Sequence, residues 1–281
     1  MRSLAIAAAA CGFGAVSVIA KLAYDAGASP PSLFAARVVV AGAVLSPLAL
    51  RRTRRVARGS LLLAGGAGLA FAAAGFLEFE ALSRLPASVV VTIVFASPLW
   101  IWLAVWAVSG RPPGRGGLAL FGIVAAGLAL LVRGPVHARF DLVGVAIALS
   151  ASMLFAAVFL LLEALVRSES GPWGVASIAI AAAVVAGCLH GHGAVEVLSD
   201  AATRPHALGV GVLTATSLLL LAAGMRRTRA FAAAVITGVE PVAATLLAAI
   251  VLGEAVGPVQ AIGGLAVIVG VTGIARTADA A

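Results

Sequence analysis

Six ionisable side chains interrupt the long apolar stretches of this sequence, and they are its first candidates for chemistry. They are Lys21, Arg37, Glu78, Glu80, Glu163 and Glu240. A charged group near the centre of a membrane-spanning helix costs about 3 kcal/mol on insertion scales, so each needs water, a partner or a function. Most of the six lie near the ends of their stretches, where a side chain reaches the membrane surface as readily as a binding site. Arg37 lies further in and can either reach the surface or pair with an acid.

Glu240 differs from the others because it lies near the middle of its stretch and directly precedes Pro241. Proline removes a backbone donor and clashes with the preceding turn, so Pro241 and its counterpart Pro98 should each kink a helix. The freed carbonyls must face protein or water, because lipid cannot bind them. Glu240 is therefore our first candidate for a functional carboxylate, which would bind a substrate ammonium group or carry a proton. The alternative is a pair of packing kinks without ligand contact.

Aromatic and polar residues accompany these charges at helical spacing. Residues four apart share one face of a helix, and several such stripes pair an aromatic ring with a polar end. Lipid or core contact is the alternative for each stripe. The predicted substrate-binding residues are Phe13, Ser17, Lys21, Phe76, Phe79, Glu80, Phe95, Ser97, Trp102, Phe155, Thr237 and Glu240, with Pro98 and Pro241 as kink or gating positions.

The elements that must position these residues are membrane-spanning helices. The 281 residues are 62% hydrophobic and 11% charged, whereas soluble domains are about 45–50% apolar and about 25% charged. Ten stretches approach the length of about 20 residues that a helix needs to cross the hydrocarbon core. They run over 3–23, 32–50, 60–82, 87–109, 116–132, 141–165, 172–190, 207–225, 230–252 and 257–275. We interpret the first stretch as a retained span and not as a cleaved signal peptide.

The arginines predict the orientation of these spans. With the N-terminus inside the cell, thirteen arginines fall in cytoplasmic segments and four in the opposite loops, which satisfies the positive-inside rule. Both termini are therefore predicted to be cytoplasmic. The net charge of +8 reflects this orientation, and we expect no nucleic-acid partner. For the arginine cluster over 51–58, the alternative interpretation is contact with anionic lipid.

The two halves of the chain form an internal repeat. A shift of 142–143 residues places Pro98 on Pro241, Gly110 on Gly253 and Phe13 on Phe155. Each half, 1–137 and 138–281, holds five spans, and an odd number of spans makes the repeats enter the membrane in opposite senses. Inverted repeats of this kind are typical of secondary transporters, whose substrate site lies at the midplane between the halves.

The other reactive residues show no pattern typical of an enzyme, a cofactor site or a metal site, so we expect none of these. The sequence has no ATP-binding P-loop and no nucleophile–base pair, and Cys11 and Cys188 form no redox motif. Gly65, Gly66 and Gly68 lie within a span and indicate close helix packing. A group of His and acidic residues falls in or beside a loop expected over 191–206, and its spacing matches no metal site. That group consists of His190, His192, Glu196, Asp200 and His206.

The chain resembles the drug/metabolite transporter superfamily, specifically its ten-helix EamA type, and is similar to bacterial aromatic amino acid exporters. The resemblance rests on Pro98 and Pro241, on the small residues after the second proline, and on Gly253-Glu254. The stretches 82–88 and 226–230 also fit. Arg111 departs from the pattern, because the first repeat would often have an acidic partner of Glu254 there. The resemblance implies that spans one, three, four, six, eight and nine surround a central cavity, with spans two, five, seven and ten peripheral.

The resemblance also implies a function. We expect a secondary transporter of small organic metabolites in the bacterial inner membrane that works by alternating access. Amino acids are the expected substrates, with aromatic or apolar ones favoured by the aromatic lining. The expected partners are this substrate and the lipid bilayer, and the sequence is compatible with a monomer. The alternatives are a multidrug or other metabolite efflux carrier and a non-transport membrane assembly protein. Nucleotide sugars are disfavoured, because only Lys21 and Arg37 could hold a diphosphate.

Overall fold

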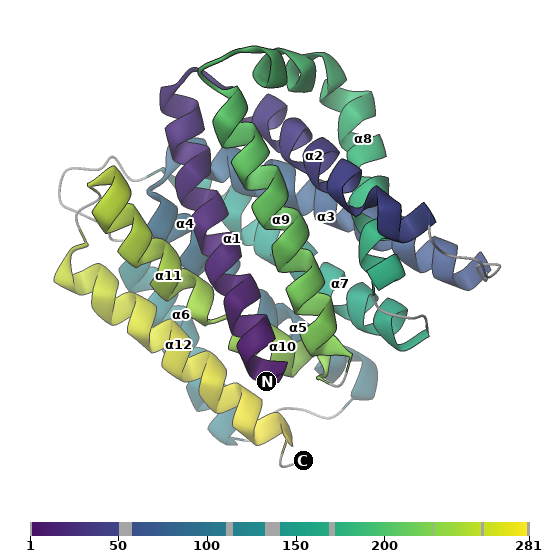
Figure 1. Ribbon diagram of the computed structural model, residues 1–281. Helices are drawn as coiled ribbons and strands as arrows, with labels where there is room; N and C mark the ends of the chain where they lie inside the picture. Colours follow the sequence, from purple (N-terminus) through teal and green to yellow (C-terminus); the bar gives the residue numbers. More distant parts are fainter. Residues whose placement is uncertain are drawn as a thin grey trace.

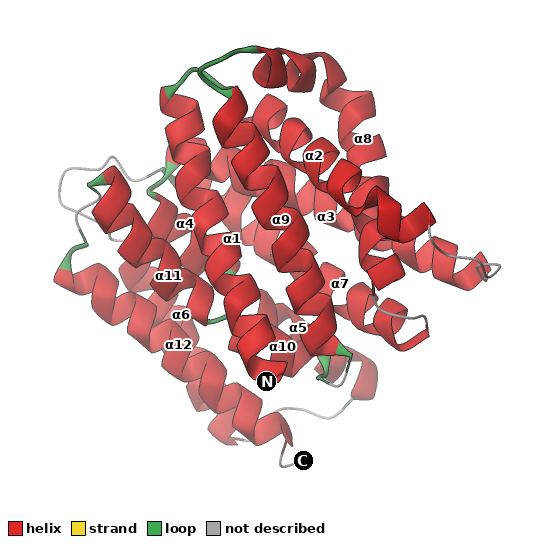
Figure 2. Cartoon of the chain, in the orientation of Figure 1, coloured by secondary structure: helices red, strands yellow, loops and turns green. Residues whose placement is uncertain are grey.

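The computed structural model describes residues 2–50, 58–110, 115–132, 141–168, 172–226, 228–253 and 256–279, and these residues form helices joined by short turns, without a strand (Figure 2). The helices are α1 (Arg2–Asp25), α2 (Pro30–Leu50), α3 (Arg58–Arg84), α4 (Ala87–Val94), α5 (Ser97–Ser109), α6 (Arg115–Val132), α7 (Leu142–Ser168), α8 (Pro172–Ser199), α9 (Arg204–Met225), α10 (Ala230–Ile236), α11 (Val239–Leu247), the π-helical turn η1 (Ala248–Leu252) and α12 (Pro258–Asp279).

Every predicted span corresponds to a helix or to consecutive helices, which confirms the all-helical membrane fold. Among the described residues, eight helical stretches are long and apolar enough to cross a membrane. Two further apolar helical stretches are shorter, Gly116–Leu130 and Pro258–Gly273. They correspond to the fifth and tenth predicted spans.

The helix of the seventh span is longer than predicted, so the prediction of a loop over 191–206 is wrong. Helix α8 continues to Ser199 beyond a break at His190, where φ is −137° and ψ is 29°. Beyond this break Ala194 and Val197 are buried, whereas the His192 side chain is 92% exposed. This alternation lets the segment lie across the end of the bundle as a short helix with one apolar side (top of Figure 1).

Both midspan prolines accompany a short break in their helices. The fourth span consists of α4 and α5, with Pro98 in the first turn of α5; the ninth consists of α10, α11 and η1, with Pro241 in the first turn of α11. A proline is tolerated in a first helical turn, where its missing N–H would have no helical partner. Within the breaks, the Ala96 N–H donates to Ile93 O and the Gly238 N–H donates to Val235 O, both at 2.9 Å. Tight i to i+3 bonds thus satisfy backbone groups at both breaks.

The helix contacts are the same when the equivalent helices of the two halves are exchanged. Helix α1 packs on α9 as α7 packs on α3, and α2 packs on α9 as α8 packs on α3. The pairs α2–α8 and α6–α12 each join equivalent helices. Both interrupted spans also end at a glycine with φ of 66°, Gly110 and Gly253, a conformation that favours glycine. These features fit two inverted five-helix repeats. The predicted boundary between residues 137 and 138 lies outside the described residues.

The ends of the chain lie together. Helix α1 begins and α12 ends at the same end of the bundle, the lower end in Figure 1. The pair α6–α12 lies at one margin of the bundle, and the interrupted helices lie between this pair and the remaining helices (Figure 1). The breaks of the two repeats therefore come together inside the molecule.

Candidate functional site

A cavity lies between the two repeats, bordered by both helix breaks. It encloses about 680 Å³ of space, counting its mouth. All six spans expected around a central cavity contribute to its walls, through α1, α3, α4–α5, α7, α9 and α10–α11. Helix α2 also contributes, through Arg37, so the expectation that span two is peripheral is wrong for this residue.

The two breaks touch each other beside this cavity. A Cβ added at Gly238, in the second break, would lie 2.6 Å from Cζ of Phe95, in the first. Phe95 and Ser97 line the cavity from one interrupted span, and Thr237 and Glu240 line it from the other. The close crossing therefore needs glycine at 238, and it gathers polar residues of both repeats around one space.

Aromatic rings make up a third of the residues that line the cavity. Phe13 on α1 and Phe155 on α7, which the internal repeat pairs, both line the cavity, together with Phe71 and Phe159. Phe71 and Phe155 stack edge to face, with ring centroids 6.3 Å apart. Neither Phe159 nor Phe71 was among the predicted binding residues. Phe159 shares a face of its helix with the predicted Phe155, four residues earlier, and Phe71 lies on α3. It lies seven residues before Glu78, on the same face of α3, which is the signal that could have identified it.

The predicted binding residues divide into two groups. Those that line the cavity are Phe13, Phe95, Ser97, Phe155, Thr237 and Glu240. Those that lie outside its lining are Ser17, Lys21, Phe76, Phe79, Glu80 and Trp102. Of the two prolines, Pro98 is buried and Pro241 lines a separate groove of about 740 Å³ between α4, α11 and α12.

The aromatic residues outside the lining pack in other places. Phe76 and Phe79 surround Phe34, with ring centroids 4.6 and 5.5 Å from that of Phe34. Trp102 packs on Phe121 of α6, at 4.6 Å. On α1, Ser17 is fully buried with no hydrogen-bond partner for its hydroxyl among the described residues, and Lys21 is partly exposed. Burial and helix packing account for these aromatic side chains.

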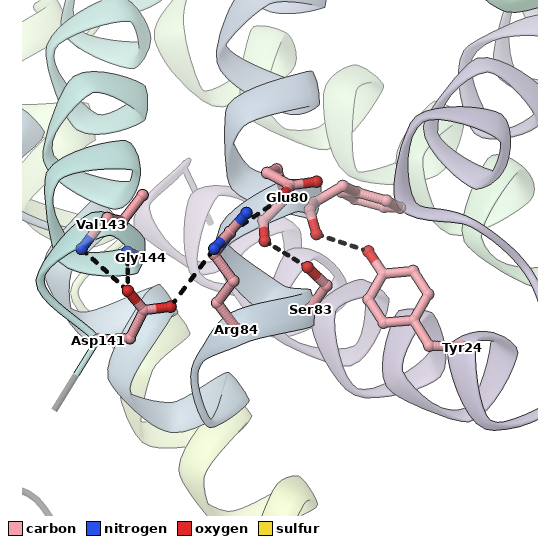
Figure 3. A network of polar contacts seen from close by, with 8 residues as sticks. Tyr24, Glu80, Ser83, Arg84, Asp141, Val143 and Gly144 are labelled. Atoms are coloured by element: carbon pink, nitrogen blue, oxygen red, sulfur yellow. Dashed lines mark hydrogen bonds and ion pairs between the residues drawn. The ribbon is translucent and has the colours of Figure 1, made fainter. Parts of the chain in front are cut away.

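Glu80 belongs to a polar network at the end of α3, away from the cavity lining (Figure 3). Its Oε1 accepts a hydrogen bond from Nε of Arg84 at 2.9 Å. Arg84 also pairs with Asp141 at 3.7 Å, and Asp141 Oδ1 accepts the backbone N–H groups of Val143 and Gly144 at the start of α7. The network therefore ties the end of α3 to the N-terminus of α7, and the reading of Glu80 as a surface charge fits its position.

The centre of charge in the cavity is Arg37, which pairs with an acid and does not reach the surface. Its Nη1 lies 3.6 Å from Oε2 of Glu78, and both side chains are buried. Its Nε donates a 2.7 Å hydrogen bond to Oγ1 of Thr214 on α9. The guanidinium carbon lies 5.0 Å from the ring centroid of Phe79 and 5.8 Å from that of Phe71, within the range of cation–π attraction. Sequence reasoning named Arg37 and Glu78 as buried charges, but their pairing depends on how α2 packs against α3.

Glu240 lines the same cavity from the second repeat, in the first turn of α11. Among the described residues its carboxylate has no hydrogen-bond or ion-pair partner, although it is close enough to Arg37 and Glu78 for electrostatic interaction. Two carboxylates and one guanidinium thus line the cavity, which carries a net negative charge when all three groups are ionised. A space of this kind suits a molecule that brings a positive group to Glu240.

The histidine group forms no metal site. No cluster of metal-ligating side chains occurs among the described residues. His192 Nε2 lies 3.2 Å from Oε1 of Glu196, one turn away on α8, and both side chains are largely exposed. Arg111 and Glu254, the position of the expected departure from the family pattern, lie outside the described residues.

Comparison with known proteins agrees with this architecture. The model of the EamA-like transporter family matches the chain twice, over residues 2–133 and 142–276. One solved structure, described only as the crystal structure of a protein, is 20% identical with a TM-score of 0.64, and the alignment covers 97% of each chain. This likeness shows a shared fold. No curated protein sequence matches. The two matches to the family model fall on the two halves that pack by exchange, and the chain therefore belongs to the EamA-like transporter family, whose members are membrane transporters of small molecules.

Proposed function

We propose that this chain transports amino acids with aromatic or apolar side chains across the bacterial inner membrane by alternating access, with both termini cytoplasmic. The observation that carries the proposal is the carboxylate of Glu240, which lacks a partner among the described residues inside a cavity walled by phenyl rings. A charge without a partner in a largely apolar cavity is costly, so Glu240 favours a ligand that supplies the opposite charge.

The remaining wall supports an apolar ligand body. Phe13, Phe155 and Phe159 offer ring surface, and burial of apolar surface contributes about 25 cal/mol per Å². An ammonium group near such rings also gains cation–π attraction of about 0.5–2 kcal/mol. The proposed pose places the ammonium group at Glu240 and the side chain among the rings.

Efflux of cationic drugs or other metabolites is the second candidate, because a carboxylate among aromatic rings suits many organic cations. Arg37 argues for amino acids over plain cations. Its positive charge faces the same cavity and would repel a ligand that carries only positive charge. A zwitterion can pair with both Arg37 and Glu240.

The proposed mechanism uses the two breaks as hinges. Residues at breaks in helices can absorb backbone rotation with little change elsewhere, and inverted repeats move as bodies around a fixed midplane site. The crossing of the breaks at Phe95 and Gly238 supports this mechanism, because both breaks border the cavity. Rocking of one repeat against the other would then open the cavity to one side of the membrane at a time.

The test is uptake of labelled amino acids into liposomes at two pH values, for the wild type and Glu240→Gln. We expect saturable uptake by the wild type and an affinity at least about tenfold lower in the variant, because a charge-assisted hydrogen bond contributes about 1.5–3 kcal/mol and 1.4 kcal/mol is tenfold. The control is Glu196→Gln, an exposed glutamate on α8. Absence of saturable flux for every amino acid would remove the amino-acid proposal. Wild-type kinetics in Glu240→Gln at both pH values would remove the role of Glu240.

A further inference from the structure

We propose that Arg37 binds the carboxylate of the substrate and that Glu78 occupies this place on Arg37 while the cavity is empty. The inference rests on the proposed function, because it supplies the second half of an amino-acid site. It begins with a donor that has no hydrogen bond. Nη1 of Arg37 is buried and has no hydrogen-bond partner among the described residues, and its distance of 3.6 Å to Glu78 is too long for one.

The guanidinium is held in position for an incoming anion. Thr214 accepts a hydrogen bond from Nε at 2.7 Å and donates its own hydroxyl proton to the carbonyl of Val210 at 2.7 Å. The rings of Phe34, Phe71 and Phe79 surround the guanidinium carbon at 5.0–5.8 Å. A guanidinium fixed in this way presents its remaining N–H donors in a planar arrangement that matches a carboxylate.

Glu78 holds this position loosely. It reaches Arg37 from α3 through one long contact, and both residues line the cavity. A carboxylate that enters the cavity competes for the same donors and can make the shorter, two-bond contact that Glu78 does not make. Arg37 is also the one cation that lines this cavity among the described residues, since Lys21, the other cation within a predicted span, lies outside the lining.

Arg37 and Glu240 together would select a zwitterion. A ligand with only an ammonium group is repelled by the positive charge of Arg37 and leaves Arg37 paired with Glu78. A ligand with only a carboxylate is repelled by the negative charges of Glu78 and Glu240. The amino acid answers both, and its side chain then lies among the rings. Arg37 is therefore a specificity-determining residue.

The test compares three ligands that share one phenyl group: L-phenylalanine with both charged groups, phenethylamine with the ammonium only, and 3-phenylpropionate with the carboxylate only. Binding to the purified protein is measured for the wild type, Arg37→Gln, Arg37→Lys and Glu78→Gln, with Arg58→Gln as the exposed control. We expect Arg37→Gln to weaken binding of L-phenylalanine and 3-phenylpropionate at least about tenfold and to leave phenethylamine unchanged or tighter. Arg37→Lys should restore part of the loss. Glu78→Gln should tighten binding of both carboxylates, because it removes the competing charge.

The outcomes separate this inference from the proposed function. Equal effects of Arg37→Gln on all three ligands would make Arg37 a structural residue and overturn the inference. If that variant fails to fold, an unchanged ratio of L-phenylalanine to phenethylamine affinity in both Arg37→Lys and Glu78→Gln overturns it as well. A wild type that binds 3-phenylpropionate through Arg37 but not L-phenylalanine would keep the inference and remove the amino-acid proposal. A wild type that binds only phenethylamine, or none of the three, overturns both.

Discussion

Side chains of opposite charge line one cavity, and the position of each along its helix determines which partners it can reach. Arg37 lies within α2 and is only 2% exposed, so it must find its partners inside the protein. Glu240 lies at the start of a helix that begins inside the bundle, with no partner among the described residues. An ionisable residue near the middle of a span could be recognised from the sequence. Which acid pairs with Arg37, and which carboxylate is left for a ligand, depended on the packing of α2, α3 and α11.

A carboxylate outside the membrane spans gives a pH-dependent prediction. Asp200, between α8 and α9, accepts hydrogen bonds from the backbone N–H and the hydroxyl of Thr203, both at 3.1 Å. The backbone bond from Thr203, with its hydroxyl bond second, lowers the pKa of Asp200 below its ordinary value of 3.8. A lowered pKa in the folded state means that the carboxylate stabilises the fold above about pH 4 and that this contribution is lost as the pH falls through the lowered pKa.

Replacement of Asp200 by Asn removes the charge and keeps the size. We expect Asp200→Asn to unfold at a lower temperature than the wild type at pH 6, with the difference between them shrinking towards pH 3. Thermal unfolding of the purified protein at both pH values measures this, with Glu196→Gln on the neighbouring segment as the control. A difference of the same size at pH 3 and pH 6 would show that the charge of Asp200 does not contribute.

At the scale of elements, helices of opposite repeats approach closely where glycines replace larger residues. A Cβ added at Gly68 of α3 would overlap Cβ of Ala181 on α8 and lie 3.0 Å from Ile178 O. Gly65, nearly one turn earlier, has no atom of another residue within 4 Å of such a Cβ. The sequence predicted helix packing for this glycine cluster, and the structure assigns it to Gly68. The sequence could not distinguish these positions, because the neighbour belongs to the other repeat.

These two glycines form a matched pair for a packing test. We expect Gly68→Val to lower the free energy of unfolding by about 1–3 kcal/mol, because the added side chain overpacks the α3–α8 contact. Gly65→Val should stay within about 0.5 kcal/mol of the wild type. Chemical unfolding in detergent micelles measures both. Equal losses in the two variants would mean that the helix tolerates valine poorly at any position, and that the α3–α8 contact is not responsible.

The ends of helices were predictable where the composition of the sequence changes. They were unpredictable where contacts with other helices determine the end. The prolines of the interrupted helices predicted a kink in each of them, because proline acts through its own backbone. The continuation of α8 beyond His190 was missed. Its short final segment holds its place through contacts such as the one between Gly193 and Ser32 of α2, which no local pattern reveals. The position of Glu80 outside the cavity lining has a similar cause, since its partners Arg84 and Asp141 lie on α3 and at the start of α7.

At the scale of the whole molecule, the exchange of helix contacts between the halves links symmetry to transport. Equivalent helices occupy equivalent positions, yet the interrupted spans differ in detail, since η1 ends the second and regular helix ends the first. In transporters with inverted repeats, the opposite open state is reached when the two repeats exchange their conformations around the fixed site. The same change made in the two repeats should therefore act in opposite directions on the open states.

The paired prolines allow that test. Pro98→Ala and Pro241→Ala each restore a backbone donor in the first turn of a helix, and so favour the straighter form of one repeat. We expect one variant to increase, and the other to decrease, labelling of a cavity cysteine at position 159 by a membrane-impermeant thiol reagent added from one side. Position 159 belongs to α7 and to neither interrupted helix, and the native Cys11 and Cys188 are replaced first because both are exposed. Labelling from the opposite side should change in the reverse sense. A shift of both variants in the same direction would separate the breaks from alternating access, because two equivalent hinges of inverted repeats cannot favour the same open state by the same change.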